Sequence, residues 1–297
     1  MQEDVRWTNL RPKEIRSRLQ AKYGTQVSKF VVRRLLQKHG YRRRKAQKKR
    51  TMQQVENRDE QFQNIARLRQ EYEQAGNPVM SMDTKKKEYL GNFYRDGHLY
   101  TRDTILTNDH DFISFADGVV IPHALYDLRH NHGYIHLGTS KDTSQFACEH
   151  IRTWWQQYGL ILYPHATSIL ILCDGGGSNS SRYFIFKQDL YNLANELGVE
   201  IRIAHYPPYC SKYNPIEHRL FPHITRACQG VVFKSVDLVK QLMENTVTRT
   251  GLTLTVSVAV VDKVYQTGRQ ATDAFKEHMP ILFDDYLPRW NYRAVPL

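Results

Sequence analysis

Residues 167–174 read TSILILCD, a mostly apolar run whose only charged residue is the aspartate at its end. Such a run, bounded by polar residues, is typical of a strand buried on both faces of a sheet. On its N-terminal side, PVMSMD at 78–83 is a second run that ends on an aspartate, and VEIRIAHY at 199–206 is a third strand candidate. Helical patterns at 142–158 and 183–197 separate these strands. The alternation predicts a mixed α/β domain.

The composition is that of a globular protein. The 297 residues are 41% hydrophobic and 24% charged, which excludes a collagen-like or wholly disordered chain. The sequence lacks a run of roughly 18 apolar residues and the apolar core of a signal peptide, so we expect a cytoplasmic protein without a membrane partner. Its four cysteines are widely spaced, which argues against a zinc ribbon or a disulfide framework.

The positive charge is concentrated at one end of the chain. The net charge is +12, and residues 1–50 hold 17 Lys or Arg against three acids, whereas the remaining residues hold 25 basic and 27 acidic side chains. The N-terminal segment is therefore the part expected to bind a polyanion.

Two helices are predicted within this basic segment. RPKEIRSRLQAKY at 11–23 ends at Gly24, and KFVVRRLLQKH follows Ser28, a suitable N-cap, and ends at Gly40. Together they predict a helix-turn-helix, followed by a basic arm at 41–50 that suits phosphate contacts. A solvated helix pair with a disordered basic tail is the alternative. The residues expected to contact double-stranded DNA are Arg33, Arg34, Arg42, Arg43, Arg44, Lys45, Lys48, Lys49 and Arg50.

Three acidic residues form the candidate catalytic site. Asp83 and Asp174 end predicted strands, and Glu217 lies in the first turn of a helix predicted over 216–228. Each position alone has an ordinary explanation, as a turn, cap or helix-dipole residue. If they meet at one sheet edge, however, three carboxylates suit Mg²⁺ or Mn²⁺, and a pair of such ions supports phosphoryl transfer.

The neighbours of these acids suit a nucleic-acid substrate. Gly175, Gly176 and Gly177 follow Asp174 and would let a nucleic-acid backbone approach it closely. Lys85, Lys86 and Lys87 follow Asp83 and could offset phosphate charge.

Three motifs carry a resemblance that covers nearly the whole chain: MDTKKKE at 82–88, CDGGGSN at 173–179 and PPYCSKYNPIEHRLF at 207–221. In this order they resemble the motifs of bacterial insertion-sequence transposases of the DDE class, in the ISAzo-type group related to the mariner superfamily. The resemblance implies a ribonuclease-H-like catalytic domain, in which Asp83, Asp174 and Glu217 are the metal-binding triad and Mg²⁺ is the cofactor, with Mn²⁺ able to substitute.

The same resemblance implies a domain order and an activity. Residues 1–50 would be the helix-turn-helix module, 51–78 a linker helix, 79–235 the catalytic domain and 236–297 a C-terminal α/β extension. The protein would cleave DNA at the terminal inverted repeats and join the freed 3′-hydroxyl to target DNA, as a nucleoid-associated dimer or larger assembly. Arg182, Lys212 and Arg219 lie in or beside the motifs and are further candidates for DNA contact.

Two other functions are considered. The chain begins close to Arg6-Trp7-Thr8, a point that lies inside members of the resembled family, so a truncated or domesticated, catalytically inactive DNA-binding remnant is the main alternative. A tyrosine recombinase would need a covalent nucleophile such as Tyr265 beside the H-x-x-R at 223–226, but the predicted strands do not suit a helical catalytic domain.

Overall fold

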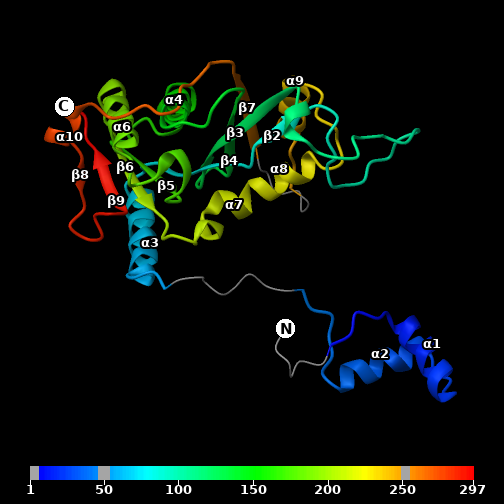
Figure 1. The fold of residues 1–297 in the computed structure, drawn as a ribbon. Coiled ribbons are helices and arrows are strands. Elements are labelled where there is room, and N and C mark those ends of the chain that lie inside the picture. Colours follow the sequence, from blue (N-terminus) through cyan, green and yellow to red (C-terminus); the bar gives the residue numbers. More distant parts are fainter. Residues whose placement is uncertain (1–6, 46–53, 249–254) are drawn as a thin grey trace. The chain divides into compact units, whose positions relative to one another are not determined.

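The computed structural model describes residues 7–45, 54–248 and 255–297. The chain divides into two compact units, Met1–Thr51 and Met52–Leu297 (Figure 1). In the first unit, α1 spans Pro12–Tyr23 and α2 spans Lys29–Lys38, so the two expected helices are present. The Ser28 hydroxyl caps α2 by accepting the Val31 N–H at 3.2 Å, and Gly24 ends α1 with a φ of +64°.

In the described part of the second unit, the strands form one nine-stranded sheet. Its strands are β1 (Val79–Thr84), β2 (Glu88–Leu90), β3 (Gly118–Asp127), β4 (His132–Gly138), β5 (Ser168–Cys173), β6 (Glu200–His205), β7 (Thr255–Val261), β8 (Leu282–Phe283) and β9 (Asn291–Ala294). The order across the sheet is β7-β4-β3-β1-β5-β6-β9-β8, and β2 pairs with β3.

The five central strands have a ribonuclease-H-like arrangement. The strands β1, β3 and β4 form an antiparallel meander, whereas β5 and β6 run parallel to β1. Parallel neighbours need crossover connections, and helices provide them here. This confirms the fold class expected from the sequence.

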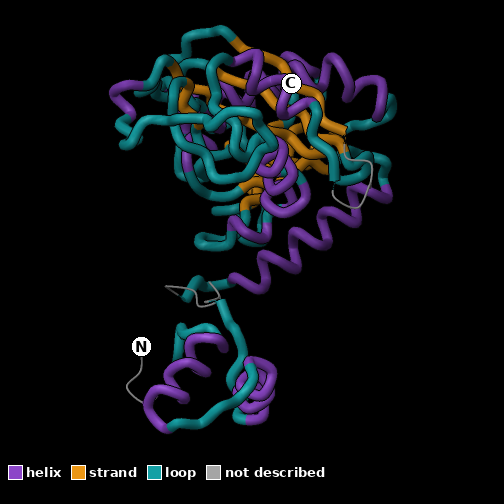
Figure 2. Tube along the Cα trace, turned by 90° about the vertical axis from the view of Figure 1, so that its right-hand side faces the viewer, coloured by secondary structure: helices purple, strands orange, loops and turns teal. Residues whose placement is uncertain are grey.

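Helices cover both faces of the sheet (Figure 2). The helices α4 (Ser144–Trp154) and α6 (Phe184–Leu197) pack on the face that carries Met80 and Met82. On the other face lie α3 (Arg58–Gln74), α7 (Pro215–Arg219), α8 (Phe221–Ala227) and α9 (Val236–Glu244). Because side chains alternate along a strand, Ser81 and Asp83 point toward this second layer.

Several elements differ from their predicted bounds. The helix predicted over 216–228 is broken at Leu220 into α7 and α8, because Pro222 in the first turn of α8 has no N–H to continue the helix. The helix predicted to reach Tyr158 is α-helical only to Trp154 and continues as a π-turn over Trp155–Gly159, followed by α5 (Leu160–Leu162).

Residues 236–297 extend the sheet on both sides. The strand β7 pairs in parallel with β4, and β9 pairs antiparallel with β6. The remaining C-terminal helix, α10 (Asp273–His278), contributes Phe275 to the core beneath α6. Single 3₁₀ turns occur at Ile113–Phe115, Gly177–Asn179 and Ser211–Tyr213. None of the helices described is both long and apolar enough to cross a membrane.

Candidate active site

Asp83 and Asp174 emerge side by side at one edge of the sheet. The strands β1 and β5 run parallel with Met82 opposite Cys173, so the next residue of each strand is one of the two acids. Because the two strands run parallel in this register, their carboxyl ends lie at the same edge of the sheet. The sheet thus brings together two residues that lie 91 positions apart in the sequence.

Glu217 reaches the same place from the short helix α7. It lies in the first turn, after Pro215, and its carboxylate interacts with that of Asp83 by charge and by a hydrogen bond. Burial, followed by repulsion from Asp174 and Glu217, raises the pKa of the Asp83 carboxyl from 3.8 to about 8. The Thr84 N–H, which donates to Asp83 Oδ1 at 2.7 Å, acts in the opposite direction. The three predicted acids therefore interact as one cluster.

A cavity of about 120 Å³ lies beside Asp83 and Asp174. Its lining also includes Thr84, Asp142 and Asn179, which the sequence analysis did not select. The Thr84 hydroxyl donates to Asp142 Oδ1 at 3.4 Å. Asp142 comes just before α4, where D-T-S indicates a helix cap, and only the course of β4 in the sheet brings it to this edge.

The glycine loop after Asp174 is open on its outer side. Gly176 and Gly177 are exposed and line the cavity. The Gly176 N–H donates to Asp174 Oδ1 at 3.2 Å, and a side chain there would approach Asp174 Oδ2 at 3.5 Å. Gly177 has a φ of +61°, a conformation that side-chain-bearing residues rarely adopt.

A buried histidine holds the start of the same loop by a hydrogen bond to its backbone. His205 at the end of β6 donates from Nδ1 to the Asp174 carbonyl oxygen at 2.9 Å, and its Nε2 accepts from the Tyr292 hydroxyl at 3.0 Å. Burial lowers the pKa of His205 to about 4, so the ring is neutral. The sequence analysis missed both residues, because a histidine and a tyrosine 87 positions apart carry no spacing signal.

The chemistry of the acidic cluster fits a hard divalent cation. Ionised carboxylates offer only acceptor oxygens, which Mg²⁺ and Mn²⁺ prefer, and a cation would offset the repulsion from Asp174 and Glu217 that, after burial, raises the pKa of Asp83. Within the described ranges, no group of three or more His, Cys, Asp or Glu side chains is arranged as a ready-made metal site.

The basic residues predicted beside the acids lie in different environments. Lys86, Lys87 and Arg182 are exposed. Lys85 forms an ion pair with Glu88 and is only 13% exposed, so its charge is already balanced within the protein. Lys212 lies over the Tyr213 ring at 5.0 Å, and Arg219 is exposed and hydrogen-bonds Tyr126.

In the first unit, the predicted DNA contacts that can be described are all solvent-exposed. They are Arg33 and Arg34 on α2 and Arg42, Arg43, Arg44 and Lys45 after it. Lys48, Lys49 and Arg50 lie outside the described residues.

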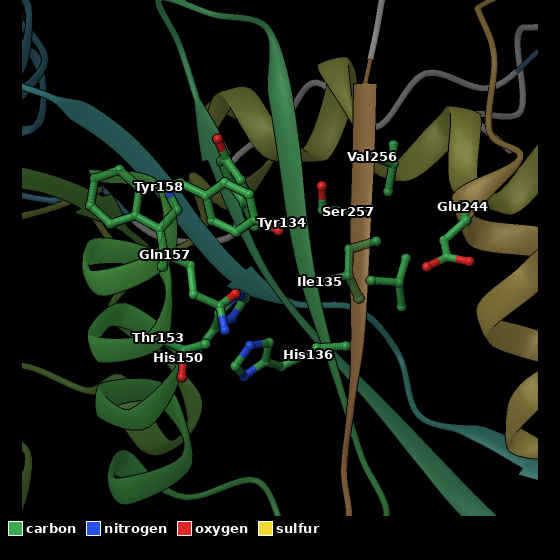
Figure 3. A pocket seen from close by; sticks show the side chains of 13 residues that line it. Tyr134, Ile135, His136, His150, Thr153, Gln157, Tyr158, Glu244, Val256 and Ser257 are labelled. Carbon is green, nitrogen blue, oxygen red and sulfur yellow. The ribbon is translucent and has the colours of Figure 1, made fainter. Parts of the chain in front are cut away.

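A larger cavity, of about 310 Å³, lies away from the acids between α4, β4 and β7 (Figure 3). Its lining includes His136 and His150, whose rings stack at 3.8 Å, and Tyr134 and Tyr158. Burial lowers the pKa of His136 to about 4, so this ring is neutral. None of the predicted site residues lines this cavity.

Tyr265, the nucleophile that a tyrosine recombinase would need, is only 2% exposed. It packs against Ile121 and Phe146, and burial raises the pKa of its hydroxyl above the usual value. A phosphodiester could not reach it in this structure.

Comparison with solved structures returned transposase complexes of low sequence identity. A pre-cleavage Mos1 transpososome is 13% identical with a TM-score of 0.48, and the match covers 81% of this chain and 72% of that chain. The Mos1 mariner paired end complex with Mn is 14% identical with a TM-score of 0.48, and the match covers 80% of this chain and 72% of that chain. The Mos1 strand transfer complex is 13% identical with a TM-score of 0.47, and the match covers 81% of this chain and 71% of that chain. Comparison with curated proteins gave no match.

The match to a protein family covers almost the complete chain. A family model described as the Rhodopirellula transposase DDE domain matches residues 1–296. This agrees with the three sequence motifs and with the sheet edge at which Asp83, Asp174 and Glu217 meet. The chain therefore belongs to the DDE transposase family.

Proposed function

We propose that this protein is an active DNA transposase in which Asp83, Asp174 and Glu217 bind the catalytic divalent metal ions. The observation that carries the proposal is the convergence of these carboxylates at one sheet edge, where burial and then repulsion from Asp174 and Glu217 raise the pKa of Asp83 to about 8. Such clustering of like charges is unfavourable for folding and is typical of functional sites. Bound Mg²⁺ or Mn²⁺ would supply Lewis acidity at the reacting phosphate.

The protein's own groups hold and orient the acids. Asp83 is fixed by the Thr84 N–H, and Asp174 by the Gly176 N–H and, through its carbonyl oxygen, by the neutral ring of His205. The exposed Gly176 and Gly177 leave room for a DNA backbone beside Asp174. Exposed Lys86 and Lys87 supply positive charge for phosphates at the same edge.

The reaction proceeds in two phosphoryl transfers. In the first, water attacks the phosphorus at the element end, the bond to the 3′ oxygen breaks, and the products are a 3′-hydroxyl and a 5′-phosphate. In the second, that 3′-hydroxyl attacks a phosphorus of the target strand and displaces a target 3′-hydroxyl. Positioning and electrostatic stabilisation provide most of the rate enhancement in such transfers.

Recognition of DNA is assigned to the N-terminal module. Residues 1–50 read double-stranded DNA at the terminal inverted repeats, 51–78 connect the parts, 79–235 perform the chemistry and 236–297 extend the catalytic sheet. The excess positive charge of residues 1–50 supports this assignment. A dimer or larger assembly follows from the need to bring two element ends together.

The decisive experiment incubates the full-length protein with its own flanking genomic DNA in Mg²⁺ or Mn²⁺ and maps breaks at nucleotide resolution. Asp174→Ala and a metal-free reaction are compared with Asp273→Asn, which removes a 91% exposed acid on α10. Discrete metal-dependent breaks that persist in Asp273→Asn and vanish in Asp174→Ala support the proposal. DNA binding without any cleavage by the wild type would instead identify an inactive DNA-binding remnant.

A further inference from the structure

Two fully buried polar side chains, Ser81 and Asn214, join β1 to the start of α7. The Ser81 hydroxyl donates to Asn214 Oδ1 and accepts the Ile216 N–H at 3.0 Å. Asn214 Nδ2 donates to the Met82 carbonyl oxygen at 3.0 Å. Both side chains are 0% exposed. Three hydrogen bonds thus connect segments that lie 133 residues apart.

Each of these residues belongs to the element that carries one of the acids. Ser81 precedes Asp83 by two positions on β1, so both side chains lie on the same face of the sheet. Asn214 occupies the N-cap position of α7, and its backbone carbonyl oxygen accepts the Glu217 N–H at 3.0 Å. The hydrogen bonds between Ser81 and Asn214 therefore set the position of the backbone bearing Glu217 relative to that bearing Asp83.

Helix α7 depends on such external support. It has five residues, too few for a helix that is stable on its own. Apolar packing by Ile216 and Leu220 holds it against the sheet but permits small shifts, because apolar contacts are not directional. Hydrogen bonds in a buried environment restrict both distance and angle.

We propose that Ser81 and Asn214 are positioning residues that hold Glu217 at the distance from Asp83 required for metal binding. The proposal rests on the function proposed above. It explains why two polar side chains occupy a fully buried place where apolar residues would be expected, since burying polar groups is favourable only when their hydrogen bonds are made.

The test removes the hydroxyl and then restores it. Ser81→Ala loses the bond to Asn214 and leaves the Ile216 N–H without its partner, whereas Ser81→Thr retains a hydroxyl on a residue suited to a strand. We expect Ser81→Ala to weaken Mn²⁺ binding about tenfold and to slow cleavage about 10- to 100-fold, because small misplacements of catalytic groups have effects of that size. Ser81→Thr should remain within about threefold of the wild type in both measurements.

Mn²⁺ binding to the full-length protein is measured from the electron paramagnetic resonance signal of free Mn²⁺, and cleavage is measured separately on DNA. Ser81→Cys serves as a second variant, since a thiol fills the same space but hydrogen-bonds weakly, and it should behave like Ser81→Ala. Ser168→Ala is the matched control. Ser168 is a buried serine at the opposite end of β5, bonded to Tyr72 and Glu200, and its loss should lower stability without changing Mn²⁺ affinity.

The results separate the two proposals. Wild-type affinity and cleavage in both Ser81→Ala and Ser81→Cys would overturn the positioning role, as would equal loss in Ser168→Ala. A wild-type protein that neither binds Mn²⁺ nor cuts DNA would overturn the proposed function, and the positioning role with it. If Mn²⁺ binding weakens in Ser81→Ala but not in Ser81→Thr, this result alone supports the positioning role of Ser81, without the cleavage data.

Discussion

Replacing Asp83 by asparagine should stabilise the metal-free protein while abolishing cleavage. In the folded state the Asp83 carboxyl is buried among two other carboxylates, which raises its pKa to about 8. In the unfolded chain its pKa is 3.8, so unfolding at neutral pH releases a proton and relieves the repulsion. Asparagine has nearly the same shape, carries no charge, and can still donate a hydrogen bond to Glu217.

The size of the effect follows from proton linkage. Each unit of difference between pH and the unfolded pKa contributes about 1.4 kcal/mol as long as the folded carboxyl remains protonated. The aspartate therefore destabilises the fold by on the order of 3 kcal/mol at pH 6 and 4 kcal/mol at pH 7 relative to a neutral side chain. The sign is fixed: a raised acidic pKa makes stability fall as pH rises, here between about 4 and 8.

Urea unfolding of the full-length protein in a metal chelator, at pH 6, 7 and 8, measures this difference. Glu88→Gln is the control of opposite sign, because ion pairs with Lys85 and Arg95 lower the pKa of Glu88 despite its burial, so its charge stabilises the fold. Adding Mg²⁺ should stabilise the wild type more than Asp83→Asn. Equal or lower stability of Asp83→Asn at all three pH values would refute the reasoning about the acidic cluster.

Three further predictions concern buried polar groups elsewhere in the second unit. Gln61→Ala removes the hydrogen bonds from α3 to the His205 carbonyl oxygen and to Asn291, and should lower the free energy of unfolding by about 2–4 kcal/mol. In a double-mutant cycle, the losses of stability in Gln61→Ala and Asn291→Ala should be far from additive. Burial lowers the pKa of Lys187 to about 8, so its own contribution to stability should rise between about pH 8 and 10.5, measured as the difference in unfolding free energy between the wild type and Lys187→Met across this range. Burial also lowers the pKa of His136 to about 4, so its own contribution to stability should fall by about 1.4 kcal/mol per pH unit from about pH 6 toward 4, measured as the difference in unfolding free energy between the wild type and His136→Leu.

Much of the fold can be predicted from the sequence because central parallel strands are apolar on both faces. The run at 168–173 was recognisable for that reason. The runs at 79–84 and 200–205 also hold polar or charged residues, and they were recognisable as further strand candidates; all three are strands of the sheet. The edges of the sheet carry weaker signals. That β7 pairs with β4, from which it is separated by more than 110 residues, and that β9 pairs with β6, follows only from the folded topology.

The residues of the candidate site also fall into those that the sequence indicates and those that only the fold brings together. Asp83, Asp174 and Glu217 stand in recognisable motifs at the ends of predicted elements, so the sequence alone determined the family and selected the acids. Only the tertiary structure identified Asp142 in the cavity, His205 beneath Asp174, and the bond between Ser81 and Asn214. The physical reason is that these groups act through contacts between segments far apart in the chain. Local sequence patterns report burial and secondary structure, whereas such contacts depend on strand order and register.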